Sequence, residues 1–332
     1  MTTARLPLAV TMGEPAGIGG ELSLKAWLAR DKTRPFFAID DPARLAALAS
    51  TLGLAVPVRE ITAPHDAASA FATALPVLSV KLEVPARHGQ PDPANAPATL
   101  AAIERAVQMA QAGTIAGFAT NPIQKKTLQD AGFRHPGHTE FLAELAGGAE
   151  VAMMLACPAL RVVPVTIHLS LADAVHALQP AVIVRAGRIA AAGLESLFGI
   201  ARPRLAVAAL NPHAGEQGLF GDEEQRILAP AVRTLGAEGP FPADTVFVRA
   251  QRGEFDAVLA PYHDVGMTAI KVASFGRAVN VTLGLPFVRT SPDHGTAFDI
   301  AGKGTANPSS LLAALTLAAR LSATAPALVP AK

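Results

Sequence analysis

Three short apolar segments in the second half of the chain are each followed, within three residues, by a histidine. The segments and their histidines are Val162–Ile167 with His168, Leu205–Leu210 with His213, and Asp256–Ala260 with His263. Each segment has the length of a buried strand. In open α/β sheets, ligands bind beyond the carboxyl ends of the strands, so the three imidazoles are expected to converge there.

Three imidazoles with an open coordination position suit a divalent transition metal. Nitrogen ligands favour Zn²⁺ or Co²⁺, with Mg²⁺ as the alternative that prefers oxygen ligands. Against this reading, any single histidine after a strand is more often a satisfied polar group than a ligand. The pattern leaves open whether all three histidines come from one subunit.

The N-terminal part of the chain has the order of an α/β unit. Leu6–Thr11 is β-like, the glycine-rich turn GEPAGIGGE follows, and LSLKAWLAR has a helical pattern. The turn is either an anion cradle at a helix N-terminus or a tight turn beside the cleft. Leu22 stands where the third glycine of G-x-G-x-x-G belongs, and no G-K-[ST] is present, so neither a Rossmann fingerprint nor a P-loop is found.

Composition bounds the class of protein. The 332 residues are enough for two domains, and half of them are hydrophobic. A formal net charge of +1 argues against a nucleic-acid partner. The single cysteine, Cys157, excludes an intrachain disulfide. The N-terminal MTTARLPLAVTMG does not have the pattern of a signal peptide, and no apolar stretch reaches the roughly 20 residues of a membrane span. We therefore expect a cytoplasmic protein.

A second group of residues is suited to an anionic ligand. Thr139 is placed like an N-cap, directly after His138, and a helix N-terminus attracts anions. Lys271, Asn280 and Arg289 each lie in or beside a β-like run. Two cations and an amide donor fit a phosphate or carboxylate group. The alternatives are helix capping alone for Thr139 and solvated surface charges for the basic residues.

At this point several motifs identify a family. GEPAGIG, GHTEFLAELA, TIHLSL, LNPHAGE, YHDVGMTAIK and VNVTLGLPFVRTSPDHGTA resemble the 4-hydroxythreonine-4-phosphate dehydrogenases of vitamin B6 biosynthesis, over about residues 6 to 318. The resemblance implies an α/β fold of the isocitrate/isopropylmalate dehydrogenase group, a homodimer of two-domain α/β/α chains with an interdomain cleft. The expected domains are residues 1–125 with 285–332 on the cofactor side, and 126–284 for metal, substrate and dimerisation.

The resemblance also implies roles for individual residues. His168, His213 and His263 match the metal-ligand positions, one of which comes from the partner subunit. The residues that match substrate-binding positions are His138, Thr139, Lys271, Asn280 and Arg289. The segment HGTAFDIAGKGTANP looks like an adenosine-binding loop, with His294, Gly295, Asp299 and Asn307 near the cofactor. A carboxylate at Asp299 favours NAD over NADP, because it repels a 2′-phosphate.

The activity implied is NAD-dependent, metal-dependent oxidation of 4-phosphooxy-L-threonine. The product then loses CO₂ to give 3-amino-2-oxopropyl phosphate. The pattern names no proton acceptor. The alternatives are a related dehydrogenase of D-threonate or D-erythronate 4-phosphate, or of a dihydrodiol dicarboxylate. A phosphate acyltransferase and a non-catalytic metal-binding protein are more distant alternatives.

Overall fold

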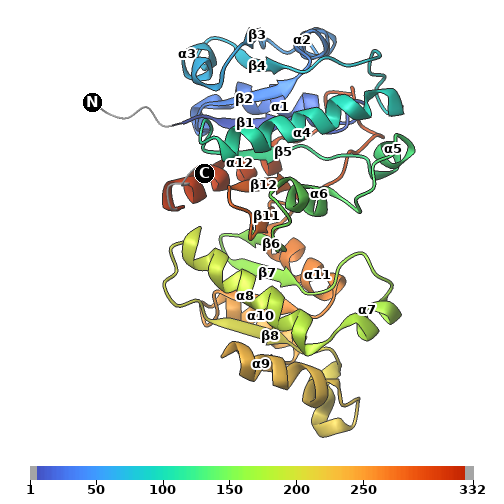
Figure 1. Ribbon diagram of the computed structural model, residues 1–332, viewed down its shortest axis with the longest axis vertical. Helices are drawn as coiled ribbons and strands as arrows, with labels where there is room; N and C mark the ends of the chain where they lie inside the picture. The colour runs from blue at the N-terminus through green and yellow to red at the C-terminus, as the bar shows by residue number, and fades with distance from the viewer. Residues whose placement is uncertain (1–5, 326–332) are drawn as a thin grey trace. The chain divides into compact units, whose positions relative to one another are not determined.

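Short buried strands alternate with helices along residues 6–325, the part of the chain that the computed structural model describes (Figure 1). The chain divides into unit 1, Met1–Ala149 with Leu285–Lys332, and unit 2, Glu150–Gly284. The sequence predicts a boundary at 125/126, whereas residues 126–149 belong with unit 1. Residues 1–5, with which the N-terminal segment MTTARLPLAVTMG begins, lie outside the described range.

Unit 1 is built on a sheet of parallel strands in the order β3-β4-β2-β1-β5-β12. The strands are β1 (Leu8–Thr11), β2 (Phe36–Asp40), β3 (Val58–Ile61), β4 (Leu75–Ser79), β5 (Gly117–Thr120) and β12 (Arg289–Pro292). Phe36, Phe37 and Phe118 are fully buried in it. Strands covered on both faces are apolar along their whole length, which is why these segments show no alternation in the sequence.

The helices of unit 1 lie along this sheet. They are α1 (Gly19–Leu28), α2 (Pro42–Thr51), α3 (Ala67–Phe71), α4 (Ala96–Gln111), α5 (Lys125–Asp130), α6 (His138–Leu145) and α12 (Ser309–Thr324), with 3₁₀ turns η1 (Arg30–Lys32), η2 (Pro64–Asp66) and η3 (Pro93–Asn95). Helix α1 packs against α2 and α12, and α4 lies across β1, β2 and β5 (Figure 1).

Unit 2 is built on a mixed sheet in the order β11-β6-β7-β10-β8-β9. The strands are β6 (Ala152–Cys157), β7 (Leu160–Pro164), β8 (Leu205–Ala208), β9 (Glu238–Phe241), β10 (Ala257–Ala260) and β11 (Val279–Leu283). Strand β6 is antiparallel to β7 and to β11, whereas β7, β10, β8 and β9 are parallel. The antiparallel pairs were not expected from the sequence.

The helices of unit 2 follow its strands. They are α7 (Leu171–Ala177), α8 (Pro180–Ser196), α9 (Ala229–Leu235), α10 (Ala243–Gln251) and α11 (His263–Ser274), with a tight turn η4 (Pro212–Gly218) and a π-helical turn η5 (Glu224–Leu228). The α/β class expected from the sequence is confirmed. No helix among residues 6–325 is long and apolar enough to cross a membrane.

The prediction that Lys271 lies in or beside a strand was wrong, because residues 263–274 form helix α11. Its buried positions Gly266, Ile270 and Ser274 recur every four residues, which is a helical period. A Cβ on Gly266 would meet Val162 Cγ1 at 2.8 Å, so glycine lets the helix approach β7 closely. The short run AIKVASF has strand-like composition, but the packing of this face decides its structure.

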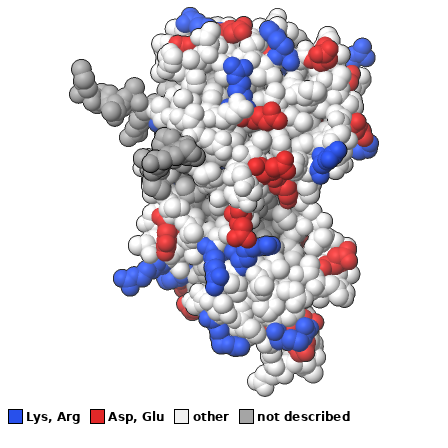
Figure 2. Space-filling view, in the orientation of Figure 1, with Lys and Arg blue, Asp and Glu red and all other residues white. Residues whose placement is uncertain are grey.

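The surface carries charges of both signs. Lys and Arg side chains are interspersed with Asp and Glu on the face shown in Figure 2. This agrees with the formal net charge of +1.

The N-cap of helix α2 offers a test of this fold. Asp41 Oδ1 accepts from Ala43 N at 2.9 Å and Arg44 N at 3.3 Å, and Oδ2 accepts from Leu82 N at 3.1 Å. Replacing Asp41 by Ala should therefore lower the free energy of unfolding by about 1–2 kcal/mol. Asp41→Asn, which keeps one acceptor oxygen, should lose less than half as much. Fluorescence of the single tryptophan, Trp27 in α1, reports urea unfolding of this unit.

An unchanged stability for Asp41→Ala would contradict the capping role.

Candidate active site

The three predicted metal ligands follow three adjacent strands of unit 2. Strand β10 pairs with β7 on one side and β8 on the other, both in parallel, so the carboxyl ends of all three lie at one edge. His168 follows β7, His263 begins α11 after β10, and His213 lies in the turn after β8. Each of the three apolar segments contains a strand, and a histidine follows its carboxyl end, as expected from the sequence.

Two of these histidines line one pocket. A cavity of about 210 Å³ is lined by Thr166, Ile167, His168, Leu169, Leu171, Ala174, Tyr262, His263 and Asp264. The Nδ1 atom of His263 lies 2.6 Å from Oδ1 of Asp264. A carboxylate on Nδ1 leaves Nε2 as the ring atom available to a ligand. The pocket thus presents imidazole nitrogens, which are donors suited to Zn²⁺ or Co²⁺.

His213 is not part of this pocket lining. Within residues 6–325, no group of three His, Cys, Asp or Glu side chains is close enough together to hold a metal ion. A complete three-histidine site within one chain is therefore not formed in this structure. The role of the three histidines as metal ligands stays a prediction.

The backbone at His213 has an unusual left-handed conformation. Residues 213–217 all have positive φ, with His213 at 52°, and His168 has a φ of 55°. Such a conformation costs roughly 1–2 kcal/mol per non-glycine residue, and it concentrates at functional sites. It persists because the buried carboxylate of Glu224 holds the turn: its Oε1 accepts from Leu210 N at 2.9 Å and Asn211 N at 2.7 Å.

Sequence reasoning missed Glu224. Its carboxylate lies 13 residues after Asn211 in the chain, in a polar segment with no periodicity that could have identified it.

In unit 1, His138 and Arg289 lie close together. Arg289, at the start of β12, is 2% exposed, and its Nη2 donates to Thr120 Oγ1 at 2.6 Å. Burial lowers the pKa of the Arg289 guanidinium to about 10, so it remains a cation at neutral pH. Burial, and then the charges of Arg289 and Lys125, hold the pKa of His138 well below the ordinary histidine value. His138 is therefore neutral at pH 7.

Helix α6 begins at His138, with Gly137 as its N-cap residue. The prediction that Thr139 is the N-cap was wrong, since Thr139 lies inside the first turn. The Nε2 atom of His138 is buried and has no hydrogen-bond partner among the described residues. All three predicted substrate residues named so far, His138, Thr139 and Arg289, belong to unit 1. Thr120, the last residue of β5, accepts the hydrogen bond from Arg289.

The other two predicted substrate residues belong to unit 2. Asn280 lies on β11, as expected, and its Oδ1 is buried without a hydrogen-bond partner in the described part of the chain. Lys271 lies on α11 with its side chain exposed. An orphaned buried amide oxygen usually has a functional or solvent explanation. The Oδ1 atom of Asn280 is therefore an acceptor without a partner in the described part of the chain, as a ligand-binding group would be.

The glycine-rich turn after β1 is tightly packed. Gly13 has φ 68°, and a Cβ there would lie 2.6 Å from Pro122 O, while a Cβ on Gly19 would lie 2.7 Å from Met12 O. Asn121 Nδ2 donates to Thr11 O, Gly19 O and Ser23 Oγ. The glycines are thus required by close backbone contacts, which favours the tight-turn interpretation over an anion cradle.

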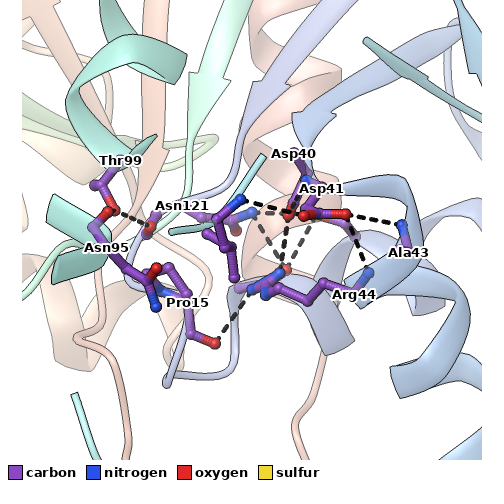
Figure 3. A network of polar contacts seen from close by, with 12 residues as sticks. Pro15, Asp40, Asp41, Ala43, Arg44, Asn95, Thr99 and Asn121 are labelled. Carbon is purple, nitrogen blue, oxygen red and sulfur yellow. Dashed lines mark hydrogen bonds and ion pairs between the residues drawn. The ribbon is translucent and has the colours of Figure 1, made fainter. Parts of the chain in front are cut away.

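A network of charged and polar groups surrounds this turn (Figure 3). Arg44 Nη1 donates to both oxygens of the buried Asp40, at 3.0 and 3.1 Å, and Nη2 donates to Pro15 O at 3.3 Å. Thr99 Oγ1 donates to Gly13 O at 3.1 Å. Burial raises the pKa of Asp40, and the Arg44 charge opposes this shift. The turn is therefore held from two sides by side chains of α2 and α4.

The predicted adenosine segment, His294–Asn307, is fixed to α1. Ile18 N donates to Thr296 O at 3.1 Å, Ala306 N donates to Glu21 Oε1 at 2.9 Å, and Lys25 Nζ donates to two carbonyls of the segment.

The four predicted cofactor residues differ in what they leave accessible. Asp299 and Gly295 are exposed, and a Cβ on Gly295 would meet no atom within 4 Å. His294 Nδ1 lies 3.0 Å from Gly295 O, and Asn307 Oδ1 accepts from Ser309 N at 3.0 Å. The segment thus offers an exposed carboxylate and an open backbone on a fixed support, which fits a ribose hydroxyl.

A separate cavity of about 350 Å³ lies in unit 1, and none of the predicted site residues lines it. It lies between α2 and residues 82–88, and its polar lining includes Asp41, Arg44, Glu83 and His88. Arg44 is already paired with Asp40 there. The charged side chains that line this cavity are of both signs, so the lining does not favour an anionic or a cationic ligand.

The lowered pKa of His138 predicts a specific pH dependence. Folded His138 stays neutral at pH values where the unfolded chain takes up a proton, so acid favours unfolding. Stability should therefore fall as the pH drops below 6.5, the ordinary histidine value, toward the folded pKa. His138→Gln should show a smaller loss between pH 7.5 and about pH 5, measured by urea unfolding. Identical slopes for wild type and variant would disprove the assignment.

Comparison with known proteins identifies the family. The family model described as pyridoxal phosphate biosynthetic protein PdxA matches residues 31–318. A 4-hydroxythreonine-4-phosphate dehydrogenase from Bradyrhizobium diazoefficiens is 52% identical over 339 residues, which cover 96% of this chain and 98% of the relative.

Two solved structures show the same fold. A 4-hydroxythreonine-4-phosphate dehydrogenase from Klebsiella pneumoniae superposes with a TM-score of 0.87 at 38% identity, over 96% of this chain and 99% of that one. A terephthalate 1,2-cis-dihydrodiol dehydrogenase from Burkholderia xenovorans gives 0.62 at 28% identity, over 95% and 97%. Sequence and fold agree over nearly the whole length, and the chain belongs to the PdxA family of pyridoxal phosphate biosynthetic proteins.

Proposed function

We propose that the protein oxidises 4-phosphooxy-L-threonine to 2-amino-3-oxo-4-phosphooxybutanoate, with NAD as the acceptor and a divalent metal ion as a cofactor. The product decarboxylates to 3-amino-2-oxopropyl phosphate in pyridoxal 5′-phosphate biosynthesis. The active form is a cytoplasmic homodimer in which each site takes residues from both subunits.

The observation that carries the proposal is the buried Arg289 close to the buried, neutral His138, in a chain of this family. A guanidinium that is 2% exposed keeps its charge at neutral pH, and its planar donors match a phosphate or carboxylate. The neutral His138 adds one hydrogen bond without adding a second full charge. Thr139 lies beside them in the first turn of α6. These groups would hold the phosphate end of the substrate.

Lys271 and Asn280 are proposed to hold the other polar groups of the substrate. An ammonium suits the α-carboxylate, and the orphaned oxygen of Asn280 suits the substrate ammonium. A doubly anchored substrate would be fixed in orientation before reaction. Such positioning is a large part of what an active site contributes.

The proposed metal ligands are His168, His213 and His263, with one of the three supplied by the partner subunit. The absence of a three-ligand group within residues 6–325 is compatible with a site completed by a second chain. Zn²⁺ or Co²⁺ is favoured, with Mg²⁺ as the alternative. When bound, the metal would withdraw charge from the substrate hydroxyl and NAD would accept the hydride.

His294, Gly295, Asp299 and Asn307 are proposed to bind the adenosine end of NAD. The exposed Asp299 would accept from the ribose 2′-hydroxyl, and the anchoring of this segment to α1 would keep it in place. NADP is the alternative cofactor. The proton acceptor is not assigned.

A second substrate class follows from the structural neighbour that acts on a cis-dihydrodiol. That enzyme has a similar fold at 28% identity, so enzymes with this fold act on more than one kind of hydroxylated anion. D-threonate and D-erythronate 4-phosphate are further alternatives, because they present the same phosphate.

The assay that tests the proposed function compares these substrates by NADH absorbance. We expect 4-phosphooxy-L-threonine to be oxidised at least about 10-fold more efficiently than D-threonate 4-phosphate or a terephthalate dihydrodiol, because only that substrate offers both a phosphate for Arg289 and an ammonium group for Asn280. A chelator should abolish turnover, and added Zn²⁺ or Co²⁺ should restore it. Equal or higher efficiency with another substrate would overturn the substrate assignment, and chelator-insensitive turnover would overturn the metal assignment.

Cofactor choice provides an independent prediction. With Asp299 facing the ribose, kcat/KM for NAD should exceed that for NADP by at least about 10-fold, since the carboxylate repels a 2′-phosphate. Asp299→Asn removes the negative charge at nearly constant size and should reduce that preference. If wild-type turnover with NADP matches turnover with NAD, the role given to Asp299 is wrong.

A further inference from the structure

Lys125, the first residue of α5, lies against the start of α6. A Cβ placed on Gly137 would come within 3.3 Å of Lys125 Cε and 3.5 Å of Nζ, so the ammonium end of the side chain packs over the N-cap of that helix. Its charge also acts on His138. Burial lowers the pKa of that histidine most, and the charges of Arg289 and then of Lys125 lower it further. Lys125 therefore points toward the predicted substrate residues of unit 1.

The ammonium group of Lys125 has no partner in the described part of the chain. It makes no hydrogen bond and no ion pair there, although its side chain is half-buried. Glu140 Oε2 approaches the same Gly137 position, at 3.4 Å, but forms no ion pair with Lys125. The next residue behaves differently: the exposed Lys126 pairs with Asp130 one turn along α5. Within the described residues, the charge of Lys125 is thus not neutralised by a carboxylate, in contrast to that of Lys126.

Positive charge therefore accumulates at one end of α6. Arg289 and Lys125 bring two cations near His138, and the N-terminus of the helix adds a partial positive charge. Like charges repel, so this arrangement is unfavourable until an anion binds among them. A phosphate dianion carries enough charge and enough acceptor oxygens to serve both cations and the backbone N–H groups of the helix.

We propose that Lys125 is a further substrate-binding residue, which contacts the phosphate group together with Arg289 and the first turn of α6. This role rests on the proposed function, because it takes the phosphate of 4-phosphooxy-L-threonine as the ligand. It extends the substrate site to α5, a helix that neither the motifs nor the family resemblance had assigned to it.

Steady-state kinetics of Lys125→Met give the first test. Loss of one charge-assisted hydrogen bond to phosphate should raise KM for 4-phosphooxy-L-threonine by about 10- to 100-fold while kcat changes much less. Lys125→Arg should recover most of the affinity, and Lys126→Met should leave KM within about two-fold as the matched control. A lower kcat with unchanged KM would overturn the proposal, since it would place Lys125 in the chemical step.

Phosphate binding gives a second readout that needs no turnover. Inorganic phosphate should raise the melting temperature of the wild type and of Lys126→Met, and acetate at equal ionic strength should raise it less, because it carries a single charge. The stabilisation by phosphate should fall by more than half in Lys125→Met. Equal stabilisation of Lys125→Met and Lys126→Met, or none in the wild type, would overturn the proposal.

The two experiments separate failure of this inference from failure of the proposed function. If phosphate stabilises the protein in a Lys125-dependent way but 4-phosphooxy-L-threonine is not oxidised, the anion site stands and the substrate is wrong. If the substrate is oxidised and Lys125→Met behaves like Lys126→Met in both assays, the function stands and Lys125 has no part in binding.

Discussion

Parallel strands end together, and the placement of the three histidines of unit 2 and of the glycine turn and Thr120 of unit 1 depends on that constraint. In unit 2, the pairing of β10 with β7 and β8 brings His168, His213 and His263 to the carboxyl ends of neighbouring strands. In unit 1, β1 and β12 lie on either side of β5. The glycine turn after β1 and Thr120 at the end of β5 therefore lie at one edge of that sheet. Residues far apart in sequence are brought to these edges by strand registers of only two to four residue pairs.

The electrostatics of unit 1 explain why its residues are arranged for a ligand rather than for stability. A buried guanidinium loses solvation, a histidine is held neutral at neutral pH, and a half-buried ammonium makes no ion pair within residues 6–325. Each of these costs free energy in the unliganded protein. In the proposed site, the phosphate of the substrate would offset these costs on binding. The left-handed turn at His213, held by Glu224, is the corresponding conformational strain in unit 2.

Much of this could be predicted from the sequence because the strands are buried on both faces. Continuous apolar runs such as LAVT and AVLA indicate strands, and the residue after each run indicates the ligand edge. The helix over Lys271 could not be predicted in this way, because its seven-residue run fits either period and packing on β7 decides between them. The same holds for Lys125 and Glu224. Their roles come from contacts with Gly137 and Asn211, which local sequence does not encode.

The central claim is that this site oxidises a phosphorylated hydroxy-amino acid whose keto product then loses its carboxyl group. The most direct measurement is the ratio of CO₂ released to NADH formed from 4-phosphooxy-L-threonine, with the phosphorylated product identified by mass spectrometry. The account predicts one CO₂ for each NADH and a product with the mass of 3-amino-2-oxopropyl phosphate. NADH formation from this substrate without CO₂, or the absence of NADH in the presence of metal and NAD, would contradict it.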